Sequence, residues 1–193
     1  MTTEKRDDRG ATLVEAAMVY ALLFLALFAV VEFGLAFKDW LSVSHAAREG
    51  ARAGATYGDA PEADILVLRD VEQTLAPAGI GEGTDVRIYR ATGLDVGTLY
   101  TYDPGNDCGD TTGGTLTGCC DWQPCPEPGR PTYSVPVWDP ANRDVSAPCT
   151  DHIGVEVRFT HIWMTNYFVP SSDFTTATDF QIEPQVFDVG TAC

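Results

Sequence analysis

Basic residues and histidines are scarce in this sequence of 193 residues. There are 12 Lys and Arg against 28 Asp and Glu, which gives a formal net charge of −16, and there are three histidines. The acidity belongs to the body of the chain, because the charges of the first ten residues cancel. An acidic surface repels nucleic-acid phosphates and anionic lipid headgroups, so we expect neither as a partner. Its simplest role is to keep the protein soluble at a crowded surface.

The common motifs of catalysis are also missing. The sequence contains no G-x-S-x-G elbow, no Walker loop and no paired-histidine motif. His152 and His161 lie nine residues apart on one predicted strand, so they face opposite sides and do not converge on one metal or substrate. We therefore predict a non-enzymatic protein with no catalytic residue, no cofactor and no metal centre.

A weak calcium candidate is the acidic stretch of residues 103–110. It is rich in oxygen ligands but lacks the spacing of an EF-hand, and an ordinary acidic turn is the simpler interpretation. The candidate ligands are Asp103, Asn106, Asp107 and Asp110.

Cysteine is absent from the first half of the chain, and all six cysteines follow in segments rich in Gly, Pro, Asp and Thr. An even number of cysteines in loop-rich sequence predicts disulfides and an oxidising compartment. Zinc is the competing interpretation, but there is no C-x-x-C pair and no histidine at ligand spacing nearby. The pairing stays open among Cys108, Cys119, Cys120, Cys125, Cys149 and Cys193.

A long uncharged run lies near the N-terminus. Residues 16–31 carry no charge, and the wider range 11–37 contains only two charged residues, Glu15 and Glu32. At about 1.5 Å per residue, this range is long enough to cross a hydrocarbon core of about 30 Å as a helix. We therefore predict a transmembrane helix.

Small residues continue the helical pattern beyond the span. Ala46, Gly50, Gly54 and Gly58 form one i, i+4 row, beside a row of alanines, with no proline before Pro61. Such a face lets another backbone approach closely. Each glycine weakens an isolated helix by about 1 kcal/mol, so the face needs a packing partner, either the protein's own sheet or a neighbouring subunit's helix.

Two other interpretations of the N-terminal region stay open. A secreted, disulfide-rich binding protein or hydrolase would use the apolar run as a cleaved signal, and a permanently bitopic envelope protein would keep it but never enter a fibre. Lysine and arginine counts are balanced on the two sides of the span, so they do not fix the orientation. The cysteines place the body outside the cytoplasm.

The N-terminal region resembles a known family. The segments Gly10-Ala-Thr-Leu-Val-Glu15, Val31-Glu-Phe-Gly-Leu-Ala-Phe37 and Ala46-Ala-Arg-Glu-Gly-Ala-Arg52, together with the apolar run, are similar to TadE-like pseudopilins. These are minor pilin-like proteins of the tight-adherence (Flp, type IVb) pilus system. The resemblance covers roughly the first sixty residues.

The resemblance implies a role and partners. It implies cleavage by a prepilin peptidase after Gly10, with Ala11 as the new N-terminus and Glu15 as a residue that sets subunit registry. It also implies contacts with other pilin-like subunits, the pilus assembly platform and membrane lipid. The expected protein is a minor pilin or pseudopilin in the cytoplasmic membrane, with its C-terminal domain outside and possible incorporation into an extracellular pilus.

The body is predicted to be an α+β domain of the pilin type. A second helix is expected over 61–75, with capping-box spacing at Asp59 and Glu62 and an apolar face at Ile65, Leu68, Val71 and Leu75. Strands are expected at 86–90, 133–138, 153–164 and 179–183, in a small antiparallel sheet. The predicted organisation is a leader at 1–10, a transmembrane and pilin-type helix at 11–60, and an extracytoplasmic domain at 61–193 with a cysteine-rich insertion at about 92–150.

Overall fold

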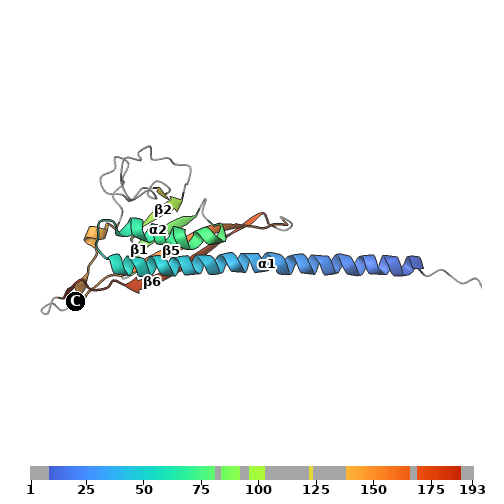
Figure 1. Cartoon of the computed structure of the whole chain (residues 1–193), viewed down its shortest axis with the longest axis horizontal. Helices are drawn as coiled ribbons and strands as arrows, with labels where there is room; N and C mark the ends of the chain where they lie inside the picture. Colours follow the sequence, from blue (N-terminus) through green and yellow to red (C-terminus); the bar gives the residue numbers. More distant parts are fainter. Residues whose placement is uncertain are drawn as a thin grey trace, which may run out of the picture.

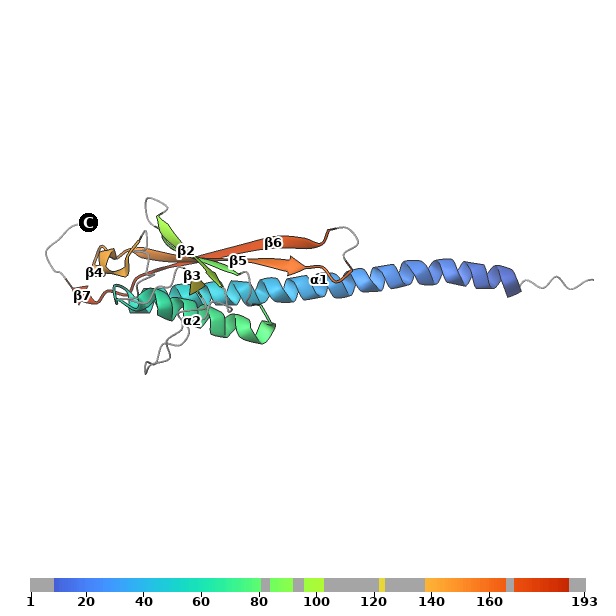
Figure 2. The same ribbon diagram turned by 90° about the horizontal axis from the view of Figure 1, so that it is seen from above.

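The computed structural model describes residues 9–80, 84–91, 96–102, 122–123, 138–165 and 169–187. A long helix α1 (Arg9–Tyr57) carries a small head built from helix α2 (Ala63–Leu75) and an antiparallel sheet (Figures 1 and 2). The described sheet has the order β3-β2-β1-β5-β6. Its strands are β1 (Asp85–Arg90), β2 (Gly97–Tyr102), β3 (Trp122–Gln123), β5 (His152–Ile162) and β6 (Ser171–Gln181). The α+β prediction is confirmed.

Shorter elements complete the described head. The 3-10 helix η1 (Ala76–Ala78) follows α2, and η3 (Pro140–Asn142) precedes β5. Strands β4 (Ser146–Ala147) and β7 (Val186–Phe187) pair in parallel, apart from the main sheet. This pairing places the segment just before β5 beside the segment just after β6.

Helix α1 has two unlike halves. Its N-terminal half extends alone beyond the head, whereas its C-terminal half lies along the sheet and α2 (Figure 1). The helix ends at Tyr57 because Gly58 adopts a left-handed conformation, with φ +54°, and its N–H donates to Gly54 O at 3.0 Å. The predicted helix to residue 60 was therefore slightly too long, and Gly58 terminates the small-residue row instead of continuing it.

Helix α2 begins two residues later than predicted. The expected capping box is wrong, since Glu62 is the N-cap residue and makes no side-chain capping bond. A backbone turn replaces it, in which Ala63 N–H donates to Ala60 O at 2.9 Å. The predicted apolar face is confirmed as buried, with Ile65, Leu68, Val71 and Leu75 at most 2% exposed.

Strands β1 and β5 occur where they were predicted, but two other strands were missed or underestimated. Strand β6 is 11 residues long, and the polar sequence of both its faces concealed all but its end. Strand β2, like the two-residue strands β3 and β4, lies inside the range predicted as a cysteine-rich insertion. Of the range predicted as a strand at 133–138, Trp138 lies in a turn and the rest is outside the described residues.

The core lies between one face of the sheet and the two helices. Ile88 pairs with Val155 and Val86 with Val157, which places alternate apolar side chains of β1 and β5 on one face. These four side chains are at most 1% exposed. A Cβ added at Gly50 would come within 2.6 Å of Val71 on α2 and 3.3 Å of Val155 on β5. The small-residue face of α1 thus packs against the protein's own helix and sheet.

A buried ion pair joins the end of α1, helix α2 and the sheet. The side chains of Arg143 and Asp64 are 0% and 4% exposed, and the Arg143 guanidinium donates to the Asp64 carboxylate. Asp64 also accepts from the Tyr100 hydroxyl at 2.7 Å, and Arg143 donates to Gly58 O at 3.2 Å. The guanidinium carbon lies 4.7 Å from the centroid of the Trp138 ring. Trp138 is thus a core residue, 6% exposed.

The cysteine and calcium predictions lie mostly outside the described residues. Cys149 is disulfide-bonded, and the other five cysteines are not among the described residues. The disulfide-stapled loop therefore stays a prediction. The calcium candidates Asp103, Asn106, Asp107 and Asp110 also lie outside the described part.

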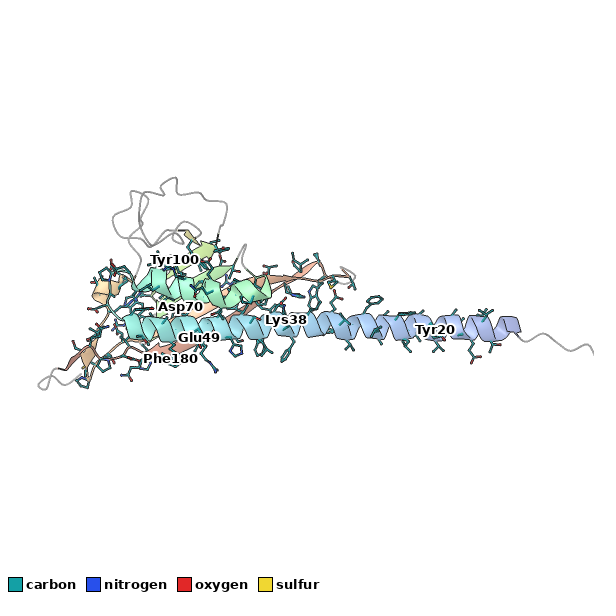
Figure 3. The ribbon with its side chains drawn as sticks, viewed as in Figure 1. Tyr20, Lys38, Glu49, Asp70, Tyr100 and Phe180 are labelled. Atoms are coloured by element: carbon teal, nitrogen blue, oxygen red, sulfur yellow. The ribbon has the colours of Figure 1, made fainter. Side chains whose placement is uncertain are left out.

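Asp70 on α2 predicts a pH-dependent contribution to stability. Burial, followed by repulsion from Glu49 on α1, raises the pKa of Asp70 above its ordinary value of 3.8, while Arg69 opposes the change. Figure 3 shows Asp70 and Glu49 on the two neighbouring helices. A raised pKa means that the folded state holds the proton more tightly, so stability falls as pH rises through that pKa.

We expect Asp70→Asn to raise the free energy of unfolding at pH 7 by about 0.5 kcal/mol, which is the usual size of half-exposed charge effects. The gain should disappear below pH 3.8, where Asp70 is protonated in both states. Urea unfolding of the full chain in micelles at several pH values measures both effects. In a Glu49→Gln background the gain should shrink, and an unchanged or larger gain there would contradict the repulsion.

Candidate membrane-anchoring site

The free half of α1 exposes a continuous apolar surface. None of residues 12–31 is buried, and the helix is long and apolar enough to cross a membrane, with a mean hydropathy of 2.4 in its most apolar window. Figure 3 places Tyr20 on this free half and Lys38 on the part of α1 that the head overlaps. A core helix of a soluble protein would be covered, and soluble monomers rarely expose apolar patches of this extent. The helix is therefore suited to a lipid environment.

The contacts between the head and α1 extend toward the N-terminus of the helix as far as Glu32. The Glu32 carboxylate accepts from the backbone N–H and from the hydroxyl of Thr165, both at 2.8 Å, and Glu32 is 9% exposed. Thr165 lies just after β5, 133 residues away in sequence. The sequence showed Glu32 only as a carboxylate near the end of the apolar run. A carboxylate at the end of an apolar run suggests a polar partner, but the sequence did not indicate that this partner is Thr165.

A second polar pair lies two helical turns farther along the same face of α1. Asp39 Oδ2 is 2.8 Å from Nδ1 of His161, which is 7% exposed on β5. The His161 ring stands edge-on to Trp163 at 4.9 Å between centroids, and Trp163 stands edge-on to Phe33 at 5.6 Å. Polar and aromatic contacts thus fasten the end of β5 to the middle of α1.

The residues predicted as functional fall in two separate places. Gly10 and Glu15 are exposed near the start of α1, and nothing is within 4 Å of a Cβ added at Gly10. Ala46, Gly50 and Gly54 are buried in the head. About 46 Å of helix rise separates Glu15 from Ala46. The first group is accessible to other proteins, whereas the second positions the head on the helix.

Replacing Glu32 with glutamine should loosen the end of β5. The glutamine oxygen can still accept from the Thr165 N–H, and the glutamine NH2 can donate to the Thr165 hydroxyl. Both bonds then lose the negative charge of their acceptor, which costs about 1–2 kcal/mol in total. We expect amide hydrogen exchange at Thr165 to become roughly tenfold faster or more.

Thr165→Val is the matched control for this prediction. It removes the hydroxyl but keeps the backbone donor to Glu32, so its effect on exchange in the neighbouring residues should be smaller. Equal exchange rates at Thr165 in the parent and in Glu32→Gln would show that the carboxylate does not hold this segment.

The fold and the site together define a class of protein in which a bare apolar helix carries a small α+β head. Within that class, residues 10–52 match the family model described as TadE-like protein. The match includes Gly10, Glu15, Glu32 and Gly50, and it confirms the resemblance over this range. Comparison with curated proteins and with solved structures gives no significant match.

Proposed function

We propose that the protein is a minor pilin or pseudopilin that is anchored in the cytoplasmic membrane and takes part in assembling a tight-adherence pilus. The observation that carries this proposal is the bare apolar half of α1 within the range that matches TadE-like proteins. The head lies outside the cytoplasm in this proposal, which agrees with the disulfide at Cys149. A prepilin peptidase, other pilin-like subunits and the assembly platform are its partners.

Maturation by cleavage after Gly10 would leave Ala11 as the first residue. The exposure of Gly10 is consistent with access by a peptidase. The new amine at Ala11 would lie four residues from Glu15, about 6 Å of helix rise. A carboxylate inside the edge of a bilayer is unfavourable, by up to about 3 kcal/mol at the centre, and a nearby amine offsets this cost. The amine of an adjoining subunit can serve the same purpose, which would fix subunit registry.

The contacts of Glu32 favour a membrane helix that is retained in the mature protein over a secretory signal that is removed. A signal peptidase would have to cut beyond the apolar run, and a cut there would separate the head from Glu32, Phe33 or the turns just after them. Glu32 and Phe33 both contact the end of β5. Their packing into the head supports a helix that stays attached. The permanently bitopic alternative shares this geometry, so it is distinguished by assembly with pilus components.

Two variants test the proposal. N-terminal sequencing of the membrane-extracted protein should find Ala11 first in the parent, whereas Gly10→Ala should retain the leader. Glu15→Ala should stay in the membrane but co-purify poorly with the pilus assembly components, because the registry carboxylate is lost. Gly34→Ala is the control, since Gly34 is exposed on the same helix with nothing within 4 Å of its Cβ position.

A first residue other than Ala11 would contradict the cleavage. Normal co-purification of Glu15→Ala would contradict the registry role. If the correctly processed parent never associates with pilus components, the permanently bitopic protein is the better description.

A further inference from the structure

A groove of about 460 Å³ lies between α1 and the connection from β5 to β6. Leu25, Phe28, Ala29, Glu32 and Phe33 line it from α1, and Trp163, Thr165 and Val169 line it from the connection. All but two of these side chains are apolar. The Glu32 carboxylate uses both oxygens to accept from Thr165 and is largely covered, so the groove presents an apolar surface.

The groove lies at membrane depth. A hydrocarbon core of about 30 Å spans about 20 helical residues, so a span that begins near Glu15 ends near Leu35. Leu25 to Phe33 therefore lie in the outer half of the bilayer if α1 spans it as proposed. Since Thr165 bonds directly to Glu32, the end of β5 reaches the same level.

The connection itself has the surface of a membrane-contacting segment. Ile162 and Met164 are each 74% exposed and Val169 is 50% exposed, although the rest of the described β5 is polar on its outer face. The sequence from Ile162 to Ser172 contains no charged residue in a chain of which 21% is charged. Exposed aliphatic residues with a tryptophan beside them are typical of a segment that rests in the interfacial zone of a bilayer.

We propose that the described residues on either side of the β5–β6 connection, Ile162 to Thr165 and Val169, enter the outer leaflet beside α1, and that the groove between them and α1 holds the acyl chain of a membrane lipid. This inference rests on the proposed membrane anchoring of α1. Lipid is the occupant because the groove-lining residues Leu25, Phe28 and Phe33 are themselves exposed on the proposed span, and an acyl chain matches the apolar lining. The head then has a second membrane contact besides the helix, which fixes its orientation on the membrane.

Quenching of Trp163 by brominated lipids tests the groove. The full chain is reconstituted in phosphatidylcholine vesicles whose acyl chains carry bromine, and the contribution of Trp163 is the difference between the parent and Trp163→Phe. We expect clear quenching of Trp163 in the parent. Ala29→Phe adds a ring to the groove wall and should remove most of this quenching, while the vesicles still carry the protein in a flotation assay.

Gly34→Phe is the matched control. It adds the same ring at similar depth where nothing lies within 4 Å of the Cβ position, so Trp163 quenching should stay at the parent level. Ile162→Ser with Met164→Ser should lower the quenching without affecting flotation, because only the hairpin contact is weakened.

Flotation separates this inference from the proposed function. A chain that floats with the vesicles but shows no Trp163 quenching would overturn the lipid-filled groove and leave the anchor intact. A chain that fails to float would overturn both. If quenching appears only at a low ratio of protein to lipid, a second copy of the chain occupies the groove at higher ratios. That result would contradict lipid as the occupant.

Discussion

Arg143→Met should lower the free energy of unfolding of the head by about 3–5 kcal/mol, the usual cost of removing one partner of a buried ion pair. Arg143 and Asp64 have side chains 0% and 4% exposed, so solvent does not replace the missing charge. Asp64 would keep the Tyr100 hydroxyl at 2.7 Å, but Gly58 O would lose its bond from Arg143. The loss should appear as an earlier urea transition of the full chain in micelles.

The same substitution at an exposed arginine is the control. Arg158 is 52% exposed and lies 3.3 Å from Glu156, so Arg158→Met should cost less than about 1 kcal/mol. Adding Asp64→Asn to Arg143→Met should recover part of the stability, because the uncompensated charge is then removed. Equal losses at the two arginines would show that the buried pair has no special role.

Gly54→Leu should destabilise the head by about 1–3 kcal/mol or more through overpacking. A Cβ at Gly54 would come within 2.5 Å of Ile153 Cδ1 and 3.3 Å of Val67 Cγ2, and leucine adds three further carbons. Intrinsic helix propensity acts in the opposite direction, because leucine is better than glycine in a helix by up to about 1 kcal/mol. A net loss of stability would therefore come from overpacking, because the change in helix propensity acts in the opposite direction.

Gly34→Leu isolates the propensity term. Gly34 lies on the same helix with nothing within 4 Å of its Cβ position, so leucine there should leave the unfolding transition of the head unchanged or slightly later. Urea unfolding followed by near-UV circular dichroism compares the two variants. If Gly54→Leu is as stable as Gly34→Leu, the packing of the small-residue face on β5 does not contribute to stability.

Local pattern was enough to predict several elements. The uncharged run gave α1, the helical spacing of Ile65, Leu68, Val71 and Leu75 gave α2, and strict alternation gave β5. Strand β6 was largely missed because its apolar residues are few and its pairing with β5 supplies most of its order. A strand that is ordered mainly by pairing with its neighbour shows only weak β propensity and weak hydrophobic alternation in its own sequence.

Hydrophobic periodicity is a property of neighbouring residues, so the order of amino acids was enough to predict a long apolar helix followed by a small α+β head. The sequence also identified the small-residue face of α1 and the TadE-like segment that contains Gly10 and Glu15. The partners of the buried charges, by contrast, depend on long-range packing. Glu32 meets Thr165 across 133 positions and Arg143 meets Asp64 across 79, since strand register and helix packing bring distant backbone segments together. The groove beside Glu32 arises from the same long-range packing, and no local pattern contains it.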